Sequence, residues 1–360
     1  NGRITVLVDG VPIDVACPNN MNPPLSYTDP ATTDSVTVIT GVSPVSLGGD
    51  TIGGTIMVET AQPRFAGSGQ TLIHGDASGF YRSNGDAFGG AASFGWANDR
   101  FSLTYDGSYT QSDNYDGGGD DGVVRSTEYA KTDHALTFAA TTGVGLFRLK
   151  GGIQRAPYEG FPNQRMDLTD NKSWFLNGRW QNWFDWGDVD LTVHYRDTDH
   201  RMNFLADKGG TADGGMPMNT EVHSAGYTLK VSLPVSSRDT IRLGSELHHE
   251  WLNDVWPPVA GSMMMGPDAF VNINAAHRDR LGTYAEWEAK WAQGLTSTIG
   301  IRNDQVWMNT GDVQPYGTSM MQMADIEAAA AFNAADHSKH DSNWSGSALL
   351  HYQAAKGIAL

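Results

Sequence analysis

The stretch 101-FSLTYDGSYT-110 alternates apolar or small side chains at its odd positions with polar side chains at its even positions. A period of two residues indicates a β-strand with one apolar face and one polar face. The same alternation sorts residues 188–196, 227–233 and 280–291, and the last of these carries Arg280, Glu286, Glu288 and Lys290 on its polar face. Because unpaired charges are costly to bury, we expect these polar faces to be hydrated.

The breaks between such stretches alternate between short and long. Tight turns are expected near 97–100, 142–145, 185–188, 235–239 and 293–295, and long segments near 111–128, 156–171, 203–222, 252–277 and 310–341. An antiparallel up-and-down transmembrane β-barrel has this spacing, with turns at one rim and loops at the other. The pattern predicts an all-β membrane barrel of about twelve strands, with a thirteenth begun at 357–360 and the barrel unfinished.

Aromatic side chains gather toward the ends of the predicted strands. In a barrel they form girdles at the membrane interfaces, although strands favour aromatic residues in any setting. The tryptophans concerned are Trp174, Trp180, Trp183, Trp186, Trp251, Trp256, Trp287, Trp291 and Trp307.

Composition narrows the function classes. The sequence has no apolar run near the roughly 20 residues that a spanning helix needs, which excludes a helical membrane protein. A soluble β-rich protein remains an alternative to a barrel with a wet lumen. The net charge of -17, without a basic stripe, argues against nucleic-acid binding. The single cysteine, Cys17, cannot form an internal disulfide. Enzyme motifs are missing, so we expect no catalysis.

The N-terminal residues carry a family resemblance. The segments RITVLVDGVP (3–12), SVTVITG (35–41) and GGDTIGGTI (48–56) resemble the second half of the plug domain of TonB-dependent outer-membrane receptors. Thr40 departs from the arginine that commonly precedes the glycine at position 41, which puts the local charge pairing of that strand in doubt.

The resemblance implies a domain organisation and a location. Residues 1–66 would be the C-terminal half of an α/β plug, and residues 67–360 the N-terminal part of a barrel of about 22 strands. The protein is then expected in the outer membrane of a Gram-negative bacterium, as a monomer in contact with lipid. We expect a TonB box and the first half of the plug to precede Asn1, and the full-length protein to couple to the TonB complex.

Sulfur and imidazole donors suggest a ligand. The chain holds 13 Met and 11 His, and thioether, thiolate and imidazole are donors that select copper, especially Cu(I). In the strand that begins at Asp188 the even positions face the lumen, so His200 and Met202 share that face. The plug lies in the same lumen, which lets Cys17 and Met21 approach them.

The spacing Cys17-x-x-x-Met21 with His200-x-Met202 is similar to the ligand set of the TonB-dependent copper receptors, and Met216-Pro217-Met218 resembles that family's Met-Pro-Met segment. The resemblance implies that Cys17, Met21, His200 and Met202 bind a transported copper ion. The possible secondary relay consists of Met216, Met218, Met263, Met264, Met265, Met320, Met321 and Met323.

Our sequence-based hypothesis is therefore an outer-membrane receptor for active copper uptake. A receptor for a siderophore or another metal chelate is the first alternative, and it would need aromatic and arginine side chains at the site in place of sulfur. A non-transport β-rich surface adhesin is the remote alternative.

Overall fold

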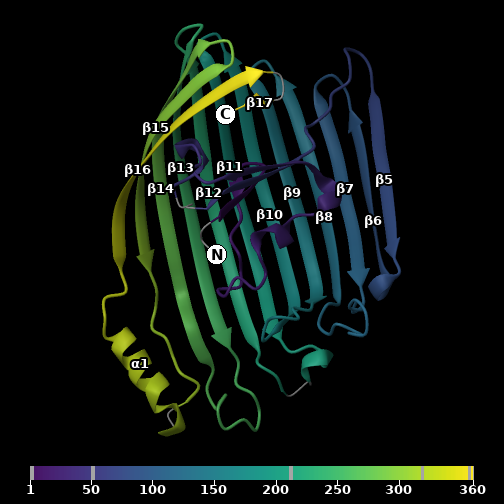
Figure 1. Ribbon diagram of the computed structural model, residues 1–360, viewed down its shortest axis with the longest axis vertical. Coiled ribbons are helices and arrows are strands. Elements are labelled where there is room, and N and C mark those ends of the chain that lie inside the picture. Colours follow the sequence, from purple (N-terminus) through teal and green to yellow (C-terminus); the bar gives the residue numbers. More distant parts are fainter. Residues whose placement is uncertain (1–3, 50–52, 211–213, 318–319, 356–357, 360) are drawn as a thin grey trace.

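A long antiparallel sheet dominates the computed structural model, which describes residues 4–49, 53–210, 214–317, 320–355 and 358–359. This 13-stranded sheet runs in chain order from β5 to β17, so that each strand pairs with its neighbours in the sequence (Figure 1). Its strands are β5 (Leu72–Arg82), β6 (Ala87–Ala97), β7 (Phe101–Ser112), β8 (Tyr129–Thr142), β9 (Gly145–Glu159), β10 (Asp167–Phe184), β11 (Gly187–Asn203), β12 (Met218–Pro234), β13 (Asp239–Trp256), β14 (Phe270–Ala292), β15 (Leu295–Asn309), β16 (Lys339–Ala355) and β17 (Ile358–Ala359). The expected twelve strands with a thirteenth begun are confirmed.

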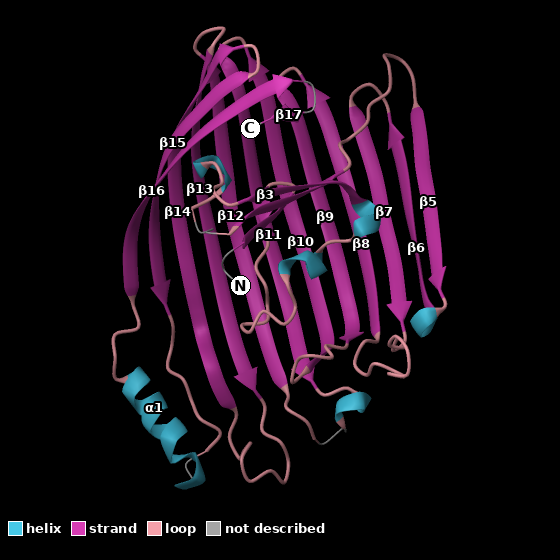
Figure 2. Cartoon of the chain, in the orientation of Figure 1, coloured by secondary structure: helices cyan, strands magenta, loops and turns pink. Residues whose placement is uncertain are grey.

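The connections alternate between the two rims of the sheet, as expected. Tight turns join the strands at one rim; in the β14–β15 turn, Gly294 has φ 81°, a left-handed value that glycine tolerates without cost. Long loops lie at the other rim together with the helix α1 (Met323–Asn333) (Figures 1 and 2). Several strands extend further into the long segments than the sequence suggested: the segment expected over 156–171 is a loop of only 160–166.

Side-chain burial follows the predicted alternation. In β11 the even positions Thr198, His200 and Met202 are buried, whereas Asp199 and Arg201 between them are exposed. The opposite, outward face of the sheet is apolar and open. Its exposed apolar side chains include Ile153, Trp174, Val193, Leu243, Ile299 and Ile301. Exposed apolar area on this scale is rare in soluble monomers and is typical of a surface in contact with lipid. Among the described residues, no helix is long and apolar enough to span a membrane.

A smaller sheet forms the N-terminal part and lies against the lumen face of the large sheet (Figures 1 and 2). Its strand order is β2-β1-β4-β3, with β1 parallel to β4. The strands are β1 (Ile4–Val8), β2 (Val11–Pro12), β3 (Thr33–Thr40) and β4 (Gly54–Thr60), and the helical segments between them are the short 3-10 helices Pro24–Tyr27, Pro30–Thr32 and Val45–Leu47. Arg3 and residues 50–52 of the quoted motifs lie outside the described residues. The predicted domain boundary at residue 66 falls in the connection 61–71 and stays a prediction.

Polar contacts fix the N-terminal part to the large sheet, called the wall below, at strands that lie far apart in that sheet. Asp9 accepts from Lys150 of β9 at 3.0 Å. On the far side, the fully buried Arg302 of β15 donates to the Val45 carbonyl at 3.2 Å and pairs with Glu246 and Asp304. Since an unpaired buried charge is costly, these contacts fix where this part of the chain sits.

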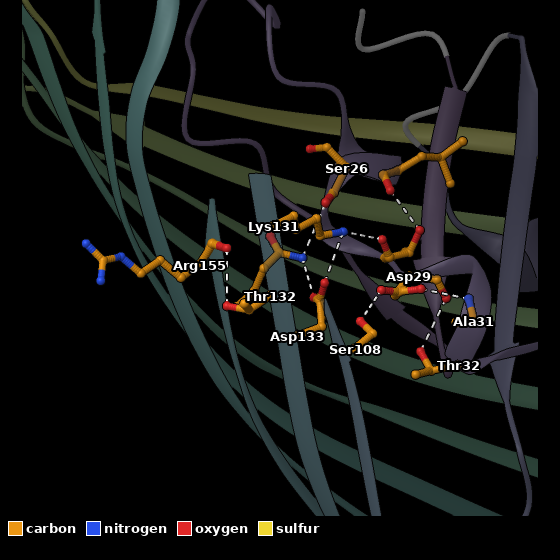
Figure 3. A network of polar contacts seen from close by, with 12 residues as sticks. Ser26, Asp29, Ala31, Thr32, Ser108, Lys131, Thr132, Asp133 and Arg155 are labelled. Atoms are coloured by element: carbon orange, nitrogen blue, oxygen red, sulfur yellow. Dashed lines mark hydrogen bonds and ion pairs between the residues drawn. The ribbon is translucent and has the colours of Figure 1, made fainter. Parts of the chain in front are cut away.

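A third group of contacts joins the segment that contains Ser26 and Asp29 to the wall (Figure 3). Asp29 accepts from the Ser108 hydroxyl of β7. Lys131 of β8 donates to the Thr28 carbonyl at 2.5 Å and pairs with Asp133 at 3.3 Å. The segment is therefore fastened to β7 and β8, two adjacent strands of the large sheet.

Candidate metal centre

A tight turn presents Cys17 and Met21 toward the wall. The Asn20 amide donates to the Cys17 carbonyl at 2.8 Å, and Asn20 has φ 53°. Proline at the second position of such a turn and asparagine at a left-handed position are both favoured, which explains the sequence Cys17-Pro18-Asn19-Asn20. Cys17 is fully buried.

On the wall, two neighbouring rows of buried side chains cross β10 to β13 near the long-loop rim. The upper row, which is the one nearer the long-loop rim at the bottom of Figure 1, pairs Leu168 with Met202 and Met202 with Met218. All three side chains are at most 1% exposed. The lower row pairs Asn171 with His200 and His200 with Thr220, and continues to Asp254 of β13. The upper row is thus apolar and sulfur-bearing, and the lower row is polar.

The turn and the upper row form one cluster. Buried Cys17, Met166, Met202 and Met218 pack together, and Met21 and Met216 pack against them. The structure therefore brings three of the four predicted ligands, Cys17, Met21 and Met202, into one group. His200 lies two residues below Met202 on the same face of β11.

The His200 ring has one occupied nitrogen and one free nitrogen. The ring is 1% exposed, and its Nδ1 lies 3.0 Å from the Oδ1 of Asn171. Because an amide oxygen can only accept, Nδ1 carries the hydrogen and Nε2 carries the lone pair. Nε2 is buried and has no hydrogen-bond partner among the described residues. A hydrogen bond that fixes the tautomer and leaves the other nitrogen open is the usual arrangement of a metal-binding histidine.

The turn that carries Cys17 is held to the wall on both sides. Before it, both carboxylate oxygens of Asp14 approach Nε2 of His248 in β13, at 3.1 and 3.0 Å. After it, the Tyr27 hydroxyl donates to Asn171 Oδ1 at 3.4 Å and accepts from the Ala16 amide at 3.4 Å. Burial raises the pKa of Tyr27 to about 12, so this hydroxyl keeps its proton at neutral pH. The Tyr27 hydroxyl thus links Ala16, the residue before Cys17, to the Asn171 side chain, which orients His200.

The loop between β11 and β12, at the long-loop end of the site, is held by an ion pair and by hydrogen bonds. Lys208 pairs at 2.5 Å with the fully buried Asp167, and the Met216 amide donates to Asn203 at 2.7 Å. From the sequence, Met216 and Met218 are expected together as relay donors in a loop. In the structure, however, Met218 is the first residue of β12 and is fully buried in the cluster. Met216 is half-buried and borders it.

The remaining predicted relay methionines lie in two loops of the same rim. Met263 is 77% exposed and Met320 is 86% exposed, and neither belongs to the buried cluster. Buried Gln322 donates to the carbonyls of Met264 at 3.2 Å and Gly266 at 3.3 Å. This side chain joins the loop that holds Met263, Met264 and Met265 to the segment that holds Met320, Met321 and Met323.

Sequence reasoning missed Met166, Asn171 and Tyr27. Their positions carry no motif, and only the strand register brings Asn171 opposite His200. Within the described residues no three His, Cys, Asp or Glu side chains are placed to hold a metal ion. The donors that lie beside Cys17 in this cluster are thioethers.

The fold and this site define a class of protein, a plug seated against a membrane-barrel wall with a buried cluster between them. The barrel model of the TonB dependent receptor-like family matches residues 125–360, and the model of the TonB-dependent receptor plug domain matches residues 1–55. The chain belongs to the TonB-dependent receptor family, whose members are receptors of the Gram-negative outer membrane. A search of curated protein sequences finds no match.

Solved structures share the fold. The copper transporter OprC superposes with a TM-score of 0.80 at 21% identity, covering 99% of this chain and 53% of its own. The FrpB iron transporter from Neisseria meningitidis (F3-3 variant) gives 0.70 at 14% identity, covering 99% and 56%. The HasR hemophore receptor of Serratia marcescens gives 0.67 at 14% identity, covering 97% and 52%. The chain thus spans about half the length of the structures that it matches, and at these identities the likeness concerns the fold alone.

Proposed function

We propose that this chain forms the copper-binding part of an outer-membrane receptor that takes up copper. The observation that carries the proposal is the buried Nε2 of His200, which has no hydrogen-bond partner in the described part of the chain and lies next to a cluster of one thiol and several thioethers. A buried polar atom without a partner costs about 1–3 kcal/mol. A bound ion would remove that cost.

The donor set favours copper over the other metals that bacteria import. Cys17 would supply a thiolate, His200 an imidazole, and Met21 and Met202 two thioethers, a set that selects Cu(I). Iron chelates would instead need room and polar contacts for the chelator. The site is a closed, apolar cluster, which fits a bare ion better than a chelate.

The methionines at the rim support a route of entry. Met218 belongs to the cluster and Met216 borders it, and a further set of methionines, exposed except for Met265, lies at the same rim: Met263, Met264, Met265, Met320, Met321 and Met323. Thioethers bind soft ions and leave them readily, so they suit capture and transfer better than storage. In the full-length protein, coupling to TonB would drive release. The apolar outer face supports contact with outer-membrane lipid, and a monomeric state stays a prediction.

The test is copper content after equal exposure to Cu(I), measured by elemental analysis on protein purified in detergent. Cys17→Ala and His200→Ala should lose the tightly held ion. Met202→Leu keeps the volume of the side chain and removes only its sulfur, so it should lower affinity without loosening the packing.

The matched control is His223→Ala in β12. His223 lies on the outward face and pairs with Asp197 at 2.7 Å, so its removal should leave copper content unchanged. If wild type, Cys17→Ala and His200→Ala retain the same copper, the four residues are not a site, and the chelate-receptor function takes precedence.

A further inference from the structure

In addition to His200, a pair of buried histidines lies deeper in the lumen, nearer the tight-turn rim. His194 of β11 and His248 of β13 are 7% and 5% exposed, and their ring centroids are 5.6 Å apart. Both residues pair with Gly226 of the intervening strand β12. A Cβ at Gly226 would lie 2.8 Å from Cε1 of His194 and 2.1 Å from the Leu247 carbonyl oxygen. The rings therefore meet across a position that accommodates only glycine.

Three nitrogens of these two rings have no hydrogen-bond partner among the described residues: Nδ1 and Nε2 of His194, and Nδ1 of His248. The fourth, Nε2 of His248, faces the carboxylate of Asp14. The Asp14 oxygens accept here, so Nε2 of His248 carries the hydrogen toward the carboxylate, and Nδ1 meets no hydrogen-bonding group among the described residues.

The position of the pair relates it to the upper site. His194 lies six residues from His200 on the same lumen face of β11, about 20 Å toward the tight-turn rim at roughly 3.3 Å per residue. Asp14, which orients His248, is three residues before Cys17. Both histidines line a small cavity of about 30 Å³ between the small sheet and the wall. Asp14 and His248 also line a larger one of about 420 Å³, together with Arg278 and Arg280.

We propose that His194 and His248 form a second, weaker Cu(I) site that receives the ion on its way inward. The proposal rests on the proposed copper uptake. Cu(I) accepts two donors in a nearly linear arrangement, and imidazole is a suitable ligand for copper. Zinc in structural sites takes four protein ligands. Because the described residues offer no group of three His, Cys, Asp or Glu, a two-donor site discriminates against zinc.

The experiment counts Cu(I) ions bound by the purified receptor under anaerobic conditions, with free Cu(I) as the probe, and records X-ray absorption of the bound metal. Wild type should bind two ions, one tightly with sulfur and one weakly with nitrogen ligands only. His194→Gln and His248→Gln should each bind one, and Cys17→Ala should bind one with nitrogen ligands only. The variant Cys17→Ala/His194→Gln should bind none.

The control is His249→Gln, which changes the next residue of β13. His249 faces outward and pairs with Asp279 at 2.5 Å, so this variant should still bind two ions. A tight ion retained in His194→Gln shows that the variant is folded. If wild type binds one ion and His194→Gln binds the same, the second site does not exist. If Cys17→Ala changes nothing while His194→Gln loses an ion, the upper site fails and the deeper one stands.

Discussion

Replacing Asn171 with leucine should weaken copper binding without removing any proposed ligand. Asn171 accepts the Nδ1 hydrogen of His200 at 3.0 Å in a place where both residues are 1% exposed. Leucine has the same number and branching of side-chain heavy atoms as asparagine but cannot accept a hydrogen bond. The Nδ1–H group would be left buried without a partner, and the ring would lose the contact that fixes its tautomer.

The size of the effect follows from that geometry. An unsatisfied buried donor costs about 1–3 kcal/mol, and about 1.4 kcal/mol corresponds to a tenfold change in Kd. The dissociation constant for Cu(I) should therefore rise by roughly 10- to 100-fold, the range usual for loss of an orienting partner. Asn171→Asp keeps an acceptor at the same place and should bind within a few-fold of wild type.

The assay is competition against a Cu(I) chelator of known affinity, carried out anaerobically on protein in detergent. Ser173→Ala is the matched control. Ser173 lies two residues along the same face of β10 and contacts Thr198 at 2.9 Å, but it does not contact His200. Wild-type affinity in Asn171→Leu would show that His200 needs no orientation, or does not bind. Equal losses in Asn171→Leu and Asn171→Asp would point to a collapsed site instead.

Three further outcomes are expected. Arg302→Met removes the partner of buried Asp304 and one of the two arginines that pair with Glu246, and breaking a buried pair in this way costs about 3–5 kcal/mol. Since Cys17 is fully buried and is the single cysteine, its rate of thiol labelling should rise steeply, while unchanged labelling would refute the role of Arg302 in docking. Burial raises the pKa of Asp9, but Lys150 and the Thr60 amide lower it by more, to below 3.8, so its stabilising contribution is present near neutral pH and is lost as the pH falls through that lowered pKa. Asp9→Asn should accordingly speed hydrogen exchange in β1 and β4 at neutral pH, and the ratio of variant to wild-type rates should approach one in strong acid; a ratio independent of pH would contradict this. Finally, in a Cys17→Ala background, Ser262→Cys in the β13–β14 loop should label on intact cells and Ser237→Cys in the β12–β13 turn should not; equal labelling would reverse the assigned orientation.

The fold was largely predictable because a lumen and a lipid phase impose opposite demands on alternate residues. The alternation that placed Thr198, His200 and Met202 on one face holds in the structure. Strand ends were less predictable: residues 156–159 and 167–171 continue β9 and β10, and a register irregularity between Leu168 and Asp170 interrupts the alternation there. The helix Met323–Asn333 was missed although its run of four alanines favours a helix.

The site was predictable only in part. Cys17, Met21, His200 and Met202 stood out because their spacing resembles the ligand set of the TonB-dependent copper receptors. Their supporting residues did not stand out, since Asn171 and Tyr27 are common residue types whose roles depend on register and docking. His194 and His248 are far apart in sequence, and only two strand registers and one glycine bring their rings together.

The division of the proposed ligands between two bodies has a mechanical consequence. Cys17 and Met21 belong to the N-terminal domain, whereas His200 and Met202 belong to the wall, so an ion held by all four is a cross-link between them. An ion that binds only the seated arrangement stabilises it by about 4 kcal/mol at a thousand times its Kd. The loaded receptor should thus resist displacement of the N-terminal domain more than the empty one. A force that shifts this domain would also separate Cys17 and Met21 from His200 and Met202. The same receptor could therefore bind the ion very tightly at rest and still release it completely when the domain is moved.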